Sequence, residues 1–347
     1  MTRTVDFRYI TMKNGADFRE IYPAENTAPV IRMSDSAEIK TSLSGTFLQD
    51  PELDWFSVEI RPELILDGVR HPLGIYAVAE ITETKSETET TVNFECYDRC
   101  WRVRDTYAET ALYFAAGTNY LAAVESLLTG AGISLITMTP SAATFPEARQ
   151  DWEIGTSYLE IINQLLSEIN YNPLWFNAAG AAVLEPASVP TAAGIDHVFD
   201  AGDIRSLMLP EITRETDLYS APNVFLCICS NADKSGVMKA TAENTNPQSP
   251  LSIARRGRRI MKVVRVDNIA SQDELQAYAD RIRNESMISG ESILVHTALL
   301  PGFGVADVTA IRTEDLSAIC IEREWEMQLA TGGNMRHTLE RVVVNLG

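Results

Sequence analysis

Residues 75–97 read IYAVAEITETKSETETTVNFECY. Both ends of this stretch are rich in β-branched and aromatic residues, which favour strands. Between them, Lys85-Ser86-Glu87 is polar and has the composition of a turn. The stretch therefore predicts a β-hairpin in which Ile75–Thr82 and Thr90–Tyr97 pair around that turn.

The rest of the first hundred residues follows the same pattern. Three further β-rich runs are Val5–Ile10, Ala37–Phe47 and Trp55–Leu66. Turn residues such as Asn14-Gly15 and Asp67-Gly68 separate the runs. Short strands joined by tight turns predict a compact antiparallel barrel or sandwich.

Two later segments open helices and resemble each other. Gly117-Thr-Asn-Tyr-Leu121 is followed by apolar residues at helical spacing, and so is Gly155-Thr-Ser-Tyr-Leu159. Ser157 and Glu160 also have the spacing of a capping box. The match fits a duplicated unit, or simply two capped amphipathic helices, and the second interpretation is the simpler one.

The remaining chain is predicted to be mostly strands. Pro173–Phe176 and Ala182–Leu184 are predicted to form a hairpin around the short loop Asn177–Gly180. A third helix is expected from Ser271 to about Met287, and Gly332-Gly333 fits a two-residue hairpin loop. The later strands are expected at Ile204–Leu209, Asn223–Cys229, Ser292–Leu300, Asp307–Ile311, Ala318–Gln328 and Met335–Asn345.

This order of elements predicts an α+β fold that is mainly β, with two β-barrel domains and inserted α+β segments. We expect a first barrel at 1–108, an inserted α+β domain at 109–196, a second barrel from 197–231 together with 292–347, and a loop and helix insertion at 232–291. The second barrel is expected to be discontinuous, because each of its β-rich flanks offers too few strands to close a core.

The charge of the chain limits its partners. The 347 residues carry 29 basic and 48 acidic side chains, a net charge of −19. A chain this acidic should repel the outside of a nucleic acid rather than grip it. No secretory signal is recognisable in Met1–Phe7, and no apolar run approaches the ~20 residues that a membrane helix needs.

Five cysteines, at irregular spacing, argue against a disulfide framework. They are Cys96, Cys100, Cys227, Cys229 and Cys320. Four of them could in principle bind zinc, but they lack the usual C-x-x-C spacing. Core packing is the favoured interpretation, so we expect no metal and no cofactor.

Motifs of known enzymes are missing from the sequence. It contains no H-E-x-x-H, no G-x-S-x-G, no phosphate-binding glycine loop and no dinucleotide fingerprint. The four histidines, His71, His197, His296 and His337, are far apart, and a structural role is favoured over a Cys/His pair that meets only in space. We therefore expect no catalytic residues.

A row of acidic residues stands out near the C-terminus. Glu322, Glu324 and Glu326 alternate with apolar and other residues, so all three are predicted to share one face of a strand. A glycosidase would need two carboxylates across a sugar cleft. Three in a row on one strand fit a solvated face better.

One cluster is basic. Arg255, Arg256, Arg258 and Arg259 surround Gly257, and Lys262 and Arg265 follow. The four arginines could dock to an acidic partner surface, or they could belong to an ordinary solvated turn and strand edge. Specific reading of a nucleic acid is not expected, because no aromatic residue is interleaved.

Several segments, taken in order, resemble the baseplate hub or tail-tip proteins of tailed bacteriophages and related prophage or tailocin particles. The opening part is carried by Ala37–Phe47, Pro72–Tyr76 and Cys96–Asp98. The middle part is carried by Trp152–Gly155, Pro173–Phe176, Asn223-Val-Phe and Ser249–Ile253. The resemblance covers nearly the whole chain. It departs at Val305-Ala306-Asp307-Val308, where the family tends to have glycine before the aspartate.

The resemblance implies a structural, non-enzymatic role. Such hubs carry two related tube-like β-barrel domains and form a homotrimeric ring at the distal end of the tail tube. The ring joins the tube or distal tail proteins to a central spike or tail-tip protein, and DNA passes through it without specific binding. The expected location is the tail baseplate of the virion, after synthesis in the cytoplasm of the bacterial host, with no membrane contact. A tail-associated cell-wall-degrading enzyme and a receptor-binding tail protein remain the alternatives.

The acidic row gains a role if the chain is such a hub. We expect Glu322, Glu324 and Glu326 to face the lumen of the ring, where carboxylates would repel passing DNA. Ile321, Trp325 and Met327 would then face the barrel core. We also expect Glu324 to lie opposite Arg341, and the inward Arg323 to need a partner such as Glu340.

Overall fold

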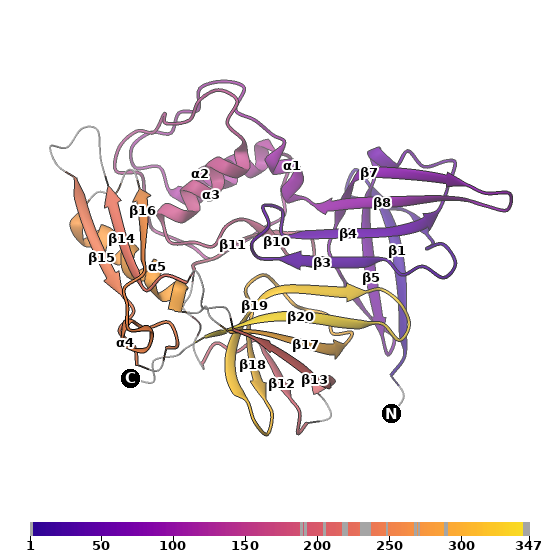
Figure 1. The fold of residues 1–347 in the computed structure, drawn as a ribbon. Helices are drawn as coiled ribbons and strands as arrows, with labels where there is room; N and C mark the ends of the chain where they lie inside the picture. Colours follow the sequence, from indigo (N-terminus) through magenta and orange to yellow (C-terminus); the bar gives the residue numbers. More distant parts are fainter. Residues whose placement is uncertain are drawn as a thin grey trace. The chain divides into compact units, whose positions relative to one another are not determined.

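The computed structural model describes residues 3–187, 190, 193–203, 206–216, 221–229, 237–247, 249–266, 269, 271–287 and 291–342, without the side chains of 285–287. The chain divides into two compact units (Figure 1). Unit 1 consists of Met1–Ser188, Ala298–Val305 and Glu324–Met335. Unit 2 consists of Val189–Thr297, Ala306–Arg323 and Arg336–Gly347.

Unit 1 begins with one antiparallel sheet. Its strands are β1 (Val5–Lys13), β2 (Ala16–Ile21), β3 (Val30–Ser34), β4 (Thr41–Leu48), β5 (Glu59–Leu66), β6 (Val69–Pro72), β7 (Tyr76–Lys85) and β8 (Thr90–Asp98), with a 3-10 turn at Trp55–Ser57. They follow the order β3-β4-β8-β7-β5-β1-β2, and β6 pairs with β5. The predicted hairpin is confirmed, since β7 and β8 pair from Tyr76↔Asp98 to Lys85↔Thr90.

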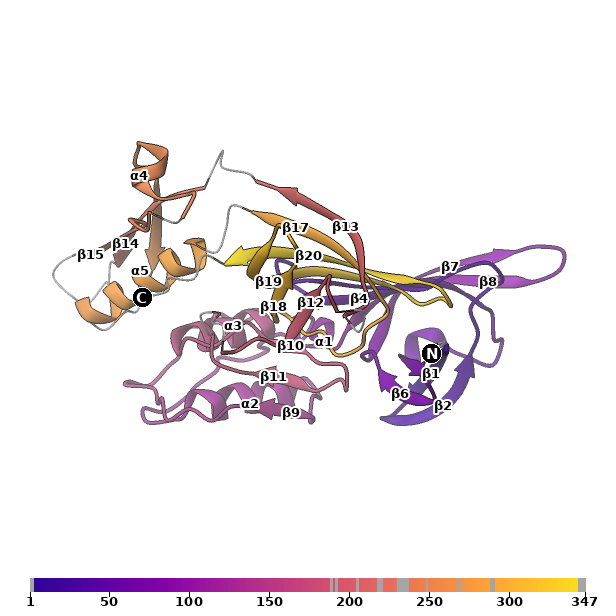
Figure 2. The ribbon, with the colours of Figure 1, turned by 90° about the horizontal axis from the view of Figure 1, so that it is seen from below.

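This sheet bends around a core without becoming a barrel of continuous strands (Figure 2). Past the end of β2, Tyr22 accepts a hydrogen bond from the backbone of Leu48, and Ala24 donates one to Thr46, both at 2.9 Å. A single bridge, Pro23↔Phe47, therefore joins β2 to β4 where a closed barrel would need a full ladder. The predicted β-barrel is open at this seam.

Aromatic side chains fill the inside of the bent sheet. Tyr9, Phe47, Phe94 and Trp55 are all buried, and their ring centroids lie 4.6–5.4 Å apart along that series. Burial of such large rings supplies much of the hydrophobic stabilisation of a small sheet. In the same unit, the end of β19 (Ser317–Gln328) pairs with β3, from Glu324↔Ser34 to Gln328↔Val30.

An α+β segment follows in unit 1. It comprises α1 (Cys100–Arg104), α2 (Tyr120–Gly130), β9 (Ile136–Met138), α3 (Tyr158–Glu168), β10 (Trp175–Phe176) and β11 (Ala182–Leu184). The predicted hairpin is confirmed by the antiparallel pair β10–β11, and β9 adds to β11 in parallel. The N-cap side chains of Asn119 and Ser157 accept backbone hydrogen bonds at the starts of α2 and α3.

The two helix starts are duplicated in their tertiary contacts, not only in their caps. Gly117 N donates to Phe145 O, and Gly155 N donates to Ala108 O, both at 2.8 Å. In return, Phe145 N donates to Thr118 O, and Ala108 N donates to Thr156 O. At the first residue of each helix, Tyr120 N donates to Ala143 O, and Tyr158 N donates to Thr106 O. Each helix start thus receives a strand-like segment that precedes the other helix, so the duplicated unit explains the sequence match better than two ordinary capped helices.

Unit 2 holds a second group of strands. These are β12 (His197–Asp200), β13 (Met208–Glu215), β17 (Ser292–Ala298), β18 (Val308–Arg312), the start of β19 and most of β20 (Asn334–Val342). Within the unit, β13 pairs with β17, and β18 pairs with both β12 and β19. The β12–β18 pair is parallel, and the β13–β17 and β18–β19 pairs are antiparallel.

A separate three-stranded sheet completes unit 2. It contains β14 (Val224–Cys229), β15 (Met238–Glu243) and β16 (Met261–Val266), in the order β15-β14-β16. Helix α5 (Gln272–Met287) packs on one face of it, and a short helix α4 (Ile253–Arg256) precedes β16. The prediction that Asn223–Cys229 would join Ser292–Gly347 in one barrel is wrong, because β14 pairs with β15 and β16 instead.

Two turns bear on the sequence predictions: the loop between β19 and β20, and the turn at Ala306. Five residues, Leu329–Gly333, separate β19 from β20, so the predicted two-residue loop at Gly332-Gly333 is wrong. At Ala306 the backbone has a φ of +59°, in the left-handed region that favours glycine. The sequence departs from the resembling family at this position, and the alanine adopts the left-handed conformation at a steric cost.

Candidate functional site

The end of β19 and its neighbours form a polar face on unit 1. Glu324 lies opposite Ser34, whose hydroxyl donates to its carboxylate at 3.3 Å. Glu326 lies opposite Arg32 and accepts from its Nε at 2.9 Å. The alternating Trp325 and Met327 are buried among the aromatic side chains of the core. Glu324 therefore presents a carboxylate to solvent, and that of Glu326 is partly neutralised.

Glu322 does not belong to this face. Its side chain is completely buried in unit 2, where it contacts His337. Burial raises the pKa of Glu322 well above the usual range of a glutamate. The expectation that Glu322 faces a lumen is therefore wrong, because a side chain enclosed by its own unit cannot line an open channel.

The partners of nearby arginines were predicted in part. Arg323 donates to Glu340 at 2.6 Å, as expected for an inward-facing cation. Arg341 pairs with Glu291 at 2.9 Å, and Arg214 also pairs with Glu291. The predicted pairing of Glu324 with Arg341 is wrong, since Glu324 instead accepts from Ser34 in unit 1.

The basic cluster spans the last turn of α4 and the turn that leads to β16 in unit 2. Arg255, Arg258 and Arg259 are exposed, and Arg259 pairs with Glu243 at 2.7 Å. Arg256 is half-buried and donates to the backbone oxygen of Ala221 at 2.6 Å. The structure thus gives the four arginines different surroundings: Arg256 and Arg259 are held within the unit, whereas Arg255 and Arg258 point to solvent.

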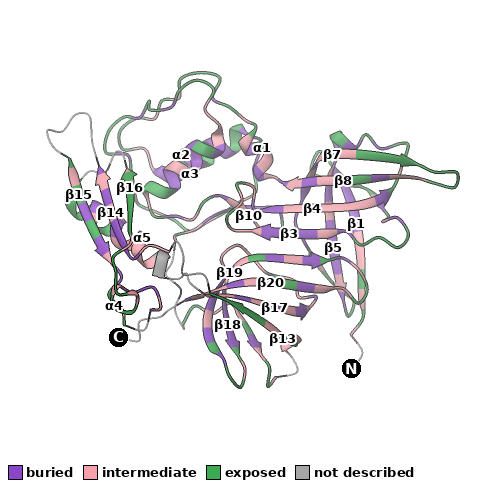
Figure 3. Cartoon of the chain, in the orientation of Figure 1, coloured by how far each residue is buried: buried purple, intermediate pink, exposed green. Residues whose placement is uncertain are grey.

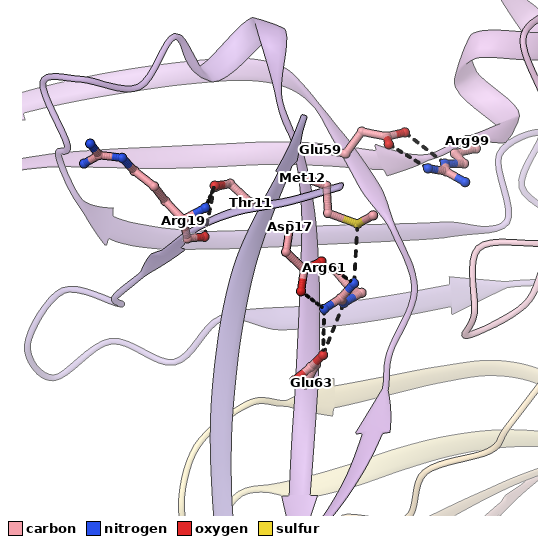
Figure 4. Close-up of polar contacts among 8 residues, drawn as sticks. All are labelled: Thr11, Met12, Asp17, Arg19, Glu59, Arg61, Glu63 and Arg99. Atoms are coloured by element: carbon pink, nitrogen blue, oxygen red, sulfur yellow. Dashed lines mark hydrogen bonds and ion pairs between the residues drawn. The ribbon is translucent and has the colours of Figure 1, made fainter. Parts of the chain in front are cut away.

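A polar network in unit 1 joins β1, β2 and β5 (Figure 4). Arg61 donates to both carboxylate oxygens of Asp17, at 2.8 and 2.9 Å, and also contacts Glu63 and the sulfur of Met12. The hydrogen bonds to Asp17 raise the pKa of Arg61. A guanidinium held by two carboxylates is a strong structural clamp, and it offers no reactive group.

Two more contacts in the same region tie strands together (Figure 4). Arg99 forms a bidentate pair with Glu59, at 2.9 and 2.7 Å. The hydroxyl of Thr11 donates to Arg19 O at 3.0 Å and accepts from Arg19 N at 3.1 Å, next to a register shift between Thr11 and Met12. The side chain of Thr11 thus stabilises the bulged part of the ladder.

A pocket within unit 1 is lined mainly by apolar side chains, among them Phe176, Phe303 and Trp325. The buried carboxyl of Asp98 also lines it and accepts hydrogen bonds from Thr41 N, Thr41 Oγ1 and Cys100 N, at 3.0, 2.7 and 2.8 Å. Burial raises the pKa of Asp98 to about 6. Since its donors belong to β4 and α1, this carboxyl fastens the sheet to the α+β segment.

One arrangement in unit 2 resembles the order of groups in a hydrolase triad. Thr297 Oγ1 lies 3.1 Å from His337 Nε2, and His337 Nδ1 lies 3.0 Å from Glu322 Oε2. All three side chains are completely buried, so no substrate can reach the hydroxyl. The geometry therefore supports a structural polar core here and gives no support to the cell-wall-degrading alternative.

The cysteines lie in hydrophobic surroundings. Cys227 and Cys229 are buried against α5, and Cys96 lies in the core of unit 1. Burial raises the pKa of Cys320 to about 12. Within the described residues no group of three or more potential ligands could hold a metal, and no helix is long and apolar enough to span a membrane.

The fold is that of prophage tail proteins. The tail protein from Neisseria meningitidis superposes with a TM-score of 0.69 at 12% identity, over 96% of each chain. The 43 kDa tail protein of prophage MuSo2 from Shewanella oneidensis superposes with a TM-score of 0.68 at 12% identity, over 97% of this chain and 98% of that one. Prophage tail protein gp18 from Listeria monocytogenes gives 0.57 at 11% identity, over 96% and 94%.

The sequence itself matches no family profile and no curated protein. The resemblance to tail-tip proteins, drawn from scattered motifs, is nevertheless confirmed at the level of the fold. Sequence reasoning missed Thr11 and His337 as organisers of polar contacts. The sequence around Thr11 contains no sign of the bulge, and the partners of His337 are distant in the chain.

Proposed function

We propose that this chain is a structural protein of a bacteriophage-type tail, acting as the hub of the baseplate. The observation that carries the proposal is the end-to-end likeness to two bacterial tail proteins, one of them from a prophage, each covered over at least 96% of its length. Because the likeness spans both units, it does not arise from a single β domain that many unrelated proteins share. The buried Thr297–His337–Glu322 contacts also favour a structural role over a hydrolytic one.

In the proposed role, three copies form a closed ring at the distal end of the tail tube. The ring joins the tube or distal tail proteins to a central spike or tail-tip protein, and DNA passes through without specific binding. The net charge of −19 supports passage without adhesion. A closed cyclic ring is also the usual form of a soluble homo-oligomer.

Glu324 and Glu326 are proposed to line the opening of that ring. They lie on the polar face of unit 1 beside the hydroxyls of Ser34 and Ser44, which do not bind phosphate strongly. Arg32, a cation on this face, is already paired with Glu326. A face of this composition would repel a DNA backbone at short range.

The direct test is negative-stain imaging and mass measurement of the purified protein, at low and high salt. The expected result is a ring of three with a central opening, favoured by salt because screening weakens repulsion between acidic subunits. Adding a tube or spike partner should shift any remaining monomer into the ring. Monomers and dimers alone, at both salt concentrations and with both partners present, would overturn the proposal.

A further inference from the structure

Strand β16 is an edge strand, and four of its six residues are exposed (Figure 3). In the order β15-β14-β16 its one described neighbour is β14, with which it pairs in parallel from Val224↔Met261 to Cys229↔Val266. Among the described residues, no strand pairs with its other edge. Such an edge presents backbone donors and acceptors that can accept a further strand.

The two faces of the sheet differ beside this edge. Val264 and Val266 pack toward α5, together with Cys227 and Cys229. On the opposite face, Met261 and Val263 are 52% and 49% exposed, and their register places them beside Val224 and Leu226 of β14. Exposed apolar side chains next to an unpaired edge are a liability unless another chain covers them.

Exposed cations lie on β16 and on the segment that leads into it. Arg255, Arg258, Lys262 and Arg265 are exposed, and none of them has an ion-pair partner among the described residues. In unit 1, by contrast, arginines such as Arg8, Arg61 and Arg99 are each paired with a carboxylate. In a chain with 48 acidic and 29 basic residues, two such cations on β16 and two on the segment before it indicate a surface made for an acidic partner.

The basic segment is also held in a fixed conformation. The buried side chain of Asn223 donates to Leu251 O and Arg258 O, at 3.2 and 3.0 Å, and accepts from Ile260 N at 2.7 Å. Gly257 ends α4 with a φ of +65°, which turns the chain toward β16. A backbone fixed in this way loses little further entropy on binding.

We infer that β16 is the docking site for an acidic β-strand of a partner tail protein. The added strand pairs with the free edge of β16. Because neighbouring residues point to opposite faces, its carboxylates reach Lys262 on one face and Arg265 on the other, and its apolar side chains cover Met261 and Val263. The inference deepens the proposed function and rests on it, since the partner is a component of the same tail.

The experiment measures hydrogen exchange and fluorescence anisotropy of the full chain with a short peptide that alternates glutamate and valine, except that a glutamate replaces its last valine, so that both faces of the added strand present a carboxylate. We expect the peptide to protect the backbone amides of β16 from exchange. Added salt should weaken the binding of the peptide, because it screens the attraction between the charges. A peptide in which proline replaces alternate valines cannot form a ladder and should not protect them. A peptide with lysine in place of glutamate should not bind.

The variant Lys262→Glu/Arg265→Glu should lower the affinity for the acidic peptide by about tenfold or more, since it turns attraction into repulsion. The matched control is Arg70→Glu/Arg336→Glu, which makes the same change of charge at two exposed positions elsewhere and should leave binding unchanged. Circular dichroism of both variants shows whether they fold. Equal peptide affinity for the folded Lys262→Glu/Arg265→Glu variant and the parent overturns the inference.

The same assays distinguish the acidic strand from two other possible occupants of the β16 edge, a nucleic acid and a second copy of this chain. If single-stranded oligothymidylate binds more tightly than the acidic peptide, and the same two substitutions abolish it, the edge is a nucleic-acid site and the inference is wrong. If β16 is protected in the protein alone and the protection disappears on dilution, the occupant is a second copy of this chain. Formation of the ring is read separately by imaging, so failure of peptide binding differs from failure of the proposed hub role.

Discussion

His337 Nδ1 lies 3.0 Å from Glu322 Oε2, and both side chains are completely buried in unit 2. Burial lowers the pKa of His337 to about 3 and raises that of Glu322 well above its usual value. The folded pair therefore holds one proton, as a neutral carboxylic acid that donates to a neutral imidazole. His337 Nε2 is then free to donate to Thr297 Oγ1.

The pair predicts a flat optimum of stability against pH. Between the ordinary pKa values of 4.5 and 6.5, the unfolded pair also holds one proton, so folding exchanges none. Above that window the unfolded pair loses its proton while the folded pair keeps it, so stability falls as pH rises. Below it the unfolded pair gains a second proton that folded His337 does not accept, so stability falls as pH falls.

The substitution Glu322→Gln tests this assignment, because its amide can still donate to His337 but has no proton to lose. We expect the variant to lose the alkaline decline, and its acidic decline to begin near the ordinary pKa of 6.5 of histidine rather than near the 4.5 of glutamate. Urea unfolding at several pH values between 4 and 8 measures the difference. Glu324→Gln, an exposed control on the same strand, should follow the parent. A Glu322→Gln curve with the same alkaline slope as the parent would contradict the assignment.

Ala306 offers a stabilising substitution. Its φ of +59° costs an alanine roughly 1–2 kcal/mol that a glycine does not incur, partly offset by the greater chain entropy of glycine when unfolded. We expect Ala306→Gly to raise the free energy of unfolding by about 1 kcal/mol. The control is Ala310→Gly in β18, where the same change in a strand should destabilise. A lower melting temperature for Ala306→Gly would refute the argument from backbone strain.

Thr11 is expected to matter more than an ordinary surface threonine. Replacing it with valine keeps the shape but leaves Arg19 N and Arg19 O without their side-chain partner at the bulge. We expect Thr11→Val to lower the free energy of unfolding by about 1–3 kcal/mol. Thr11→Ser keeps the hydroxyl and should lose less. A loss for Thr11→Val that is no larger than the loss for Thr11→Ser would contradict the role assigned to the hydroxyl.

The lumen role proposed for the carboxylates of β19 is testable in assembled particles. Glu324→Lys/Glu326→Lys should slow DNA release, because it replaces repulsion with attraction to phosphate. Glu87→Lys/Glu89→Lys, at the exposed turn between β7 and β8, makes the same change of charge as a control. Release is followed by a DNA-binding dye after triggered ejection. Particles of the first variant that release DNA as fast as the parent would rule out the lumen role.

Local features were well predicted from the sequence. The β7–β8 hairpin, the β10–β11 hairpin and the helices α2, α3 and α5 all depend on turn residues, caps and apolar spacing within a few residues of one another. The placement of β14 was not predictable in this way. Val224–Cys229 is apolar throughout and would suit any buried strand, so only the competition among distant partners decided which sheet it joined.

The sequence by itself determined the mainly β character, the acidic charge and the likeness to tail proteins, because composition, alternation and the order of motifs are properties of the chain. Tertiary structure decided which alternating residues face solvent. On β19 the alternation holds at Glu324, Trp325, Glu326 and Met327, where one face is open. At Ile321 and Glu322 both successive side chains are buried, because Thr297 and His337, brought in from other strands, enclose the second face. Burial follows from what packs against a residue, and periodicity alone does not contain that information.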